Sequence, residues 1–191
     1  MSEEDRDWRL MQQAVATEAD GHRALLAGDD AGRDLMRRAS SLYRESWEAA
    51  GPRAFGRLIG MQKAAVIAGD ASAEAEYARR EVGAEGDSPP SWYALAIAAL
   101  VEGDDGLARR AAEGMREGPD AFGRAADAID AIAHGDVEAY ATGVAAIVSD
   151  FEQRAEHLTG VPIADTALML ERIAAARGMA ARPPSELLPA G

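Results

Sequence analysis

The chain has 191 residues, of which 48% are hydrophobic, so it is long enough to bury one core or one continuous stack of repeats. It contains no cysteine, which excludes disulfides, thiolate chemistry and cysteine-ligated zinc. Its formal net charge of −13 is the opposite of the basic footprint that nucleic acid requires, and therefore favours a basic partner.

The N-terminal segment MSEEDRDW is acidic where a secretory signal would be basic and then apolar. The longest run without a charged residue extends from Ser88 to Val101, which is too short to span a bilayer. From these two features we expect a cytoplasmic protein that does not bind membranes.

Apolar residues recur with helical spacing along the chain, and alternating strand patterns are absent. Prolines precede several of the apolar runs, at positions where the first turn of a helix tolerates them. The pattern predicts an all-α protein of about nine helices. Their expected ranges are 3–27, 30–50, 53–68, 71–83, 89–102, 105–117, 120–134, 136–157 and 163–177.

Four Gly-Asp pairs separate these apolar runs. A glycine takes the left-handed conformation just past a helix end at little cost, and an aspartate beside it can cap the next helix. The pairs therefore predict tight turns between antiparallel helices. Their glycines, which are Gly28, Gly69, Gly103 and Gly135, follow one another at separations of 41, 34 and 32 residues.

The segment from Trp92 to Pro119 is the best copy of this unit, and it resembles a tetratricopeptide motif. The matching positions are Trp92, Leu95, Ala96, Gly103, Ala108 and Pro119. The segment departs from the motif at Ala99, where the family usually has tyrosine, and at Ala112, where it prefers phenylalanine. The resemblance implies a tetratricopeptide-like α-solenoid of stacked antiparallel helical hairpins, with a single repeat domain over residues 1–178.

Residues 179–191 are expected to form a proline-rich tail, because Pro183, Pro184 and Pro189 prevent a regular helix. Leu187 and Leu188 are expected to fold back and cap the last repeat, as the ends of solenoids require. The alternative is a disordered tail.

The region from Gly135 to Leu188 also resembles the C-terminal part of bacterial polymorphic-toxin immunity proteins. It shares with them an arginine-containing alanine-rich helix, a glycine and a proline-leucine tail. This resemblance implies a partner that is a toxin.

Tyr93, Ile97 and Val101 fall on one face of the helix expected over 89–102, turned away from the stripe that contains Trp92. This apolar strip is interpreted either as packing between repeats or as part of a groove that binds a partner segment.

Asp127, Asp130 and His134 share a face of the helix expected over 120–134, where they are candidates for partner binding or for a polar pocket. Three ligands on one helix without a second cluster do not make a metal site, so no metal is expected. His134 and His157 are each expected in a last helical turn as C-terminal caps, and His22 with Glu18 as an ordinary surface pair.

The sequence has no Glu-x-x-His, Walker, GxGxxG or GxSxG motif, so we predict no catalytic residue, no cofactor and no enzymatic activity. Three hypotheses for function follow. The first is a non-catalytic repeat protein that binds another protein through the concave side of the stack. The second is an immunity protein or antitoxin whose acidic surface neutralises a basic toxin. The third is a small-molecule sensor or enzyme with a pocket between helices. The oligomeric state is left open.

Overall fold

The computed structural model describes residues 3–190, which form nine helices and no strand. The all-α prediction is confirmed. None of the helices in this range is long and apolar enough to cross a membrane. The helices are α1 (Glu3–Leu26), α2 (Ala31–Ala49), α3 (Phe55–Ala68), α4 (Ser72–Val82), α5 (Pro89–Glu102), α6 (Asp105–Met115), α7 (Asp120–His134), α8 (Val137–Glu152) and α9 (Asp165–Ala176).

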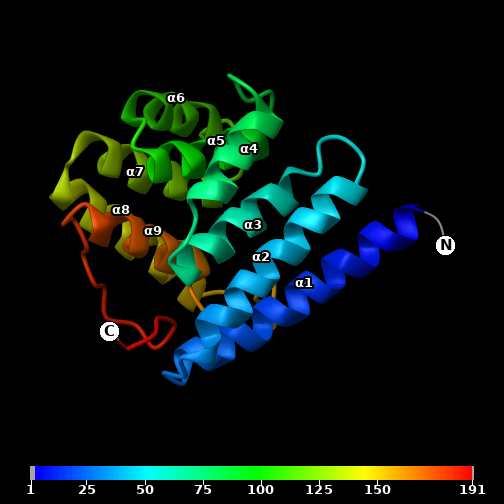
Figure 1. Ribbon diagram of the computed structural model, residues 1–191. Helices are drawn as coiled ribbons and strands as arrows, with labels where there is room; N and C mark the ends of the chain where they lie inside the picture. Colours follow the sequence, from blue (N-terminus) through cyan, green and yellow to red (C-terminus); the bar gives the residue numbers. More distant parts are fainter. Residues whose placement is uncertain (1–2, 191) are drawn as a thin grey trace.

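Helices α1 to α8 stack in chain order, each packed against the next (Figure 1). Helix α5 also contacts both α3 and α7, so these three helices form an inner layer with α5 in the middle. Helix α5 is buried almost all round, because α3, α4, α6 and α7 surround it. The main core follows this layer and continues into α8 and α9.

Helix α9 leaves this order and lies against α3, α7 and α8 (Figure 1). Met169 and Leu170 on α9 are fully buried in the main core. At its C-terminal end, Arg177 donates to the Leu100 carbonyl at 2.7 Å and pairs with Asp105 at 2.6 Å. Helix α9 therefore packs against two of the helices that flank α5, namely α3 and α7.

The prediction of Gly-Asp turns is confirmed. The four turn glycines have φ between 69° and 93°, the left-handed conformation that glycine adopts without strain. Two of the aspartates cap the next helix: Asp104 accepts from the Leu107 amide and Asp136 from the Ala139 amide, each at 3.0 Å. The turns are thus set by residues adjacent in sequence.

The helix expected over 136–157 ends earlier, at Glu152. Its last turn tightens, because the amides of Gln153 and Arg154 donate to carbonyls three residues back. Residues 153–164 then form an irregular segment, the α8–α9 loop, in which Gly160 has a φ of 70°. His157 lies in this loop with its ring 6.1 Å from that of Phe151, so its expected place in a last helical turn is wrong.

The C-terminal segment folds back along α9 (Figure 1). Leu187 and Leu188 are half-buried and pack against the main core. The Leu187 carbonyl accepts from the Ala164 amide at 2.9 Å, and Glu171 on α9 accepts from the amides of residues 181 and 182. These contacts hold the tail beside the start of α9.

Candidate functional site

A cavity of about 310 Å³ lies beside the N-terminal end of α9. Its walls come from α1, α3, α5, α7, α8, the α8–α9 loop and the start of α9, so it is formed by segments far apart in the sequence. Much of the lining is apolar, and includes Ile59, Phe122, Ile147 and Phe151. Several polar and charged side chains also line the cavity among these apolar residues.

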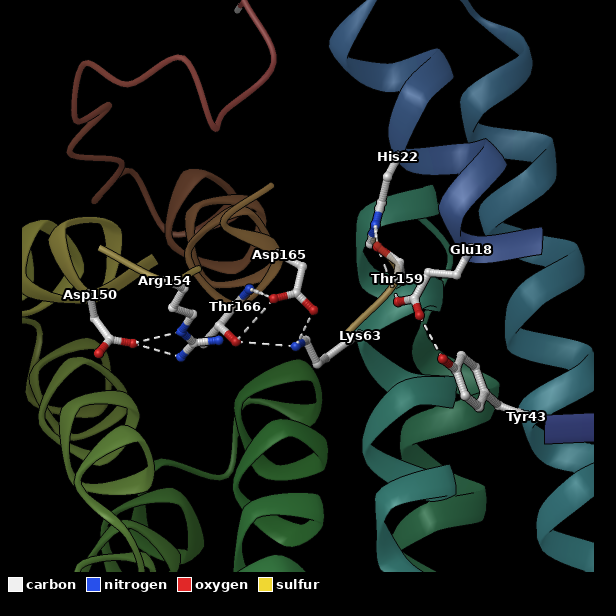
Figure 2. Close-up of polar contacts among 9 residues, drawn as sticks. All are labelled: Glu18, His22, Tyr43, Lys63, Asp150, Arg154, Thr159, Asp165 and Thr166. Carbon is white, nitrogen blue, oxygen red and sulfur yellow. Dashed lines mark hydrogen bonds and ion pairs between the residues drawn. The ribbon is translucent and has the colours of Figure 1, made fainter. Parts of the chain in front are cut away.

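Lys63 is the central charged residue of this site. It projects from α3, pairs with Asp165 and donates to the Thr166 hydroxyl at 3.1 Å (Figure 2). Burial alone would lower the pKa of Lys63, but Asp165 and neighbouring groups raise it above its usual value. Burial likewise opposes ionisation of Asp165, but Lys63 holds the pKa of that carboxyl below its usual value. The pair is therefore charged on both sides and nearly enclosed.

A second polar group lies on the opposite side of Lys63, between α1, α2 and the α8–α9 loop (Figure 2). The Tyr43 hydroxyl donates to Glu18 at 2.5 Å, and His22 Nδ1 lies 3.1 Å from the Thr159 hydroxyl. Glu18 and His22 are only 2% and 1% exposed, so the expected surface pair is wrong. The pair is buried because a loop residue 137 positions away in sequence covers it.

Burial moves the pKa values of these two side chains in opposite directions. It raises the pKa of Glu18 to about 7, with a further contribution from Asp165. It lowers the pKa of His22 to about 4, so the imidazole is neutral near pH 7. Their nearest atoms, His22 Nε2 and Glu18 Oε1, are 3.7 Å apart, which is too long for a hydrogen bond.

Three side chains of the cavity wall carry a buried polar atom that has no hydrogen-bond partner among the described residues. These atoms are Nε2 of His22, Nδ1 of His157 and the hydroxyl oxygen of Tyr93. The Tyr93 hydroxyl is near Thr166 but makes no hydrogen bond of acceptable geometry with it. Tyr93 is only 5% exposed. Leaving a buried polar group unpaired costs about 1–3 kcal/mol, so such atoms are rare in native proteins.

Two arginines share one carboxylate on the α7 and α8 side of the cavity. Arg124 Nη2 donates to Asp150 at 2.6 Å, and Arg154 donates to the other oxygen of Asp150 at 2.6 and 3.1 Å. Arg154 also lies 3.7 Å above the ring of Phe151. All three charged side chains are about one-quarter to one-third exposed, so they stand where the cavity meets solvent.

Three side chains lie in the order of the nucleophile, base and acid of a catalytic triad. They are the hydroxyl of Thr159, the imidazole of His22 and the carboxyl of Glu18. Their geometry does not activate the hydroxyl, because Glu18 makes no hydrogen bond to the imidazole. A histidine with a pKa of about 4 is also a weak base near pH 7. This arrangement fits binding better than catalysis.

The strip of Tyr93, Ile97 and Val101 is not an exposed face. Tyr93 and Ile97 are 5% and 0% exposed, and Val101 is half-buried. Tyr93 contacts the ring of Phe122 on α7 edge to face, with centroids 5.4 Å apart. The interpretation as packing between helices is therefore correct for Tyr93 and Ile97, and the partner-groove interpretation is wrong for them. Tyr93 is still part of a site, because it is one of the residues that line the cavity.

Asp127, Asp130 and His134 lie together on α7, away from the cavity lining. Arg116 pairs with both aspartates, at 3.1 and 3.7 Å, and His134 Nδ1 lies 2.9 Å from the Asp130 carbonyl. His134 thus occupies the last turn of α7, as expected. Within the described part of the chain, no three histidine or acidic side chains are arranged to hold a metal ion.

Sequence reasoning missed Lys63, Asp165 and the Arg124 and Arg154 pair. One signal was available: Lys63 is the single lysine of the chain, and it stands in the otherwise apolar end of α3. A lone charge in such a stretch is buried with a partner. The identity of that partner, 102 positions away, could not be read from the sequence.

Comparison with protein-family models, curated proteins and solved structures finds no match to this chain. The geometry of the cavity is therefore the basis for assigning a function.

Proposed function

We propose that this protein is a non-catalytic binding protein that takes a small organic molecule into the cavity beside the start of α9. The observation that supports this most strongly is the set of three buried polar atoms in its wall, on His22, Tyr93 and His157, that have no partner among the described residues. A ligand hydroxyl or carbonyl would supply the missing hydrogen bonds. This is the pocket-binding form of the third sequence hypothesis, without catalysis.

The size and lining of the cavity support the same proposal. Its volume of about 310 Å³ is at the lower end of the range for small-molecule sites, and such sites are mostly apolar with a few placed polar groups. Three larger hollows, of about 460, 610 and 780 Å³, lie along α1, at the C-terminal end of α9 and along the tail. They are more open, and the buried unpartnered atoms of His22, Tyr93 and His157 are not among their lining.

Blocking the cavity gives a direct test. Gly56 lines the cavity, and a Cβ there has open space, as it does at Gly123, which is outside the lining. Both glycines are in the first turn of a helix, so Gly56→Leu and Gly123→Leu are a matched pair. A panel of fragment-sized acids, amides and amines is screened by ligand-observed NMR. Fragments that bind the wild type are expected to bind Gly123→Leu equally and Gly56→Leu at least tenfold more weakly.

A panel that yields no binder, or binders that Gly56→Leu retains at full affinity, would contradict the proposal. Thermal melts of the three proteins serve as the folding control. Adding a fragment then gives a second readout, because a ligand that binds the folded state raises the melting temperature.

A second candidate is binding of a basic protein, including the toxin partner implied by the immunity-protein resemblance. The net charge of −13 favours it, together with exposed carboxylates such as Asp127. Association with such a partner is expected to slow as salt rises, because the Debye length shortens to about 8 Å near physiological ionic strength. Stopped-flow mixing at several salt concentrations measures this, and a salt-independent rate would count against steering by charge.

A further inference from the structure

From the charges around the cavity we infer that its ligand is an organic monoanion, such as a carboxylate with an apolar body, whose charged group lies against Arg124 and Arg154. This inference rests on the proposed function and names the class of molecule that the cavity takes.

The first step is the balance of charge. The lining contains five lysine, arginine and aspartate side chains. Three are basic (Lys63, Arg124 and Arg154) and two are acidic (Asp150 and Asp165). Lys63 and Asp165 neutralise each other. His22 is neutral near pH 7 because burial lowers its pKa. Among these five lining side chains one positive charge is therefore uncompensated, at the two arginines, in a protein whose net charge is −13.

The second step is the donor geometry. Asp150 uses one oxygen for Arg124 and the other for Arg154, so a single carboxylate serves two guanidinium groups. Arg124 contributes only Nη2 to that contact, and the structure gives its other nitrogens no partner among the described residues. A guanidinium has five N–H donors in a planar fork that matches a carboxylate. Arg124 therefore has donors left for a second carboxylate, supplied by the ligand.

The third step is the apolar body. Phe122, Ile147 and Phe151 line the cavity beside the arginines, and Tyr93 packs edge to face on Phe122. A planar or branched apolar group of the ligand would fill this space. A dianion such as a phosphate monoester would leave a partly buried excess negative charge, which is costly, so the single positive charge favours a monoanion.

Three small probes of similar shape test the charge of the ligand: phenylacetate, its neutral amide phenylacetamide and the cation phenethylamine. Affinities are measured by NMR titration of the full-length protein. Phenylacetate is expected to bind at least tenfold more tightly than either analogue. Equal binding of acid and amide, or tighter binding of the amine, would overturn the inference.

Two variants and one control variant test the arginine contact. Arg124→Gln is expected to remove the preference for phenylacetate over phenylacetamide, while Arg116→Gln, which breaks an acid-paired arginine outside the cavity, leaves it intact. Asp150→Asn is expected to raise the affinity for phenylacetate severalfold, because both guanidinium groups lose their competing carboxylate. A loss of affinity in Asp150→Asn, with the melting temperature unchanged, would contradict the contact.

The outcomes separate this inference from the proposed function. If the amide or amine binds best and Gly56→Leu abolishes that binding, the cavity is a ligand site and the anion inference is wrong. If none of the three probes binds, the anion inference is wrong for this cavity, and the broader panel then decides whether the cavity binds any ligand.

Discussion

Replacing Lys63 with methionine is expected to lower the free energy of unfolding by about 3–5 kcal/mol. The substitution removes the charge that neutralises Asp165, whose side chain is 14% exposed, and also the hydrogen bond to Thr166. Methionine fills most of the volume of the lysine stem, so the expected loss comes from the unpaired carboxylate and not from a cavity. Urea denaturation of the wild type and the variant measures the difference.

A matched control is Arg79→Met, which breaks the ion pairs of Arg79 with Glu102 and Asp104. That arginine is 41% exposed, and exposed pairs contribute about 0–1 kcal/mol. The double variant Lys63→Met, Asp165→Asn is expected to lose less than the sum of its two single variants, because neither charge is then left alone. If Lys63→Met lowers the free energy of unfolding no more than Arg79→Met does, the buried pair of Lys63 and Asp165 stabilises the fold no more than an exposed ion pair.

The parts of the fold that the sequence predicted are those determined by neighbouring residues. Gly103 and Asp104 end one helix and cap the next within a few positions, so their turn could be recognised without knowing the rest of the structure. The same holds for Gly135 and Asp136. The tetratricopeptide resemblance itself stays a prediction.

The error at Tyr93 has a physical cause that the sequence already contained. Helix α5 has no charged residue before Glu102, and a helix that is apolar all round is buried on every side. Its faces therefore cannot be divided into a core stripe and a partner stripe. The helical spacing of Tyr93, Ile97 and Val101 was read correctly, but α3 and α7 cover the first two.

The candidate site could not be predicted because its parts are far apart along the chain. Glu18 and His22 have the spacing of an exposed helical pair, and only the α8–α9 loop, through Thr159, makes them buried. That loop was itself expected to be partly helical. Where an irregular segment distant in sequence packs over a helix, the spacing of polar and apolar residues along that helix does not show that its polar face is buried.

The second large effect concerns pH, and it comes from the opposite pKa shifts of Glu18 and His22. Glu18 has a pKa of about 7 in the folded protein against an ordinary value of 4.5, so the folded state binds more protons than the unfolded state between these pH values. Its contribution to stability is therefore lost as pH rises from 4.5 to 7, by about 3 kcal/mol at 1.36 kcal/mol per pKa unit. His22, at about 4 against 6.5, binds fewer protons when folded, so its contribution grows as pH rises from 4 to 6.5.

In the wild type these two contributions offset each other over most of the range, and single variants should separate them. Glu18→Gln keeps an acceptor for the Tyr43 hydroxyl but cannot ionise, so its stability relative to the wild type is expected to increase by about 3 kcal/mol as pH rises from 4.5 to 7. His22→Gln should show the opposite trend and lose its relative stability as pH rises from 4 to 6.5. Taking differences from the wild type removes the titration of other carboxylates. Urea denaturation at half-unit pH steps gives both curves, and slopes of the same sign would mean that burial does not shift these two groups in opposite directions.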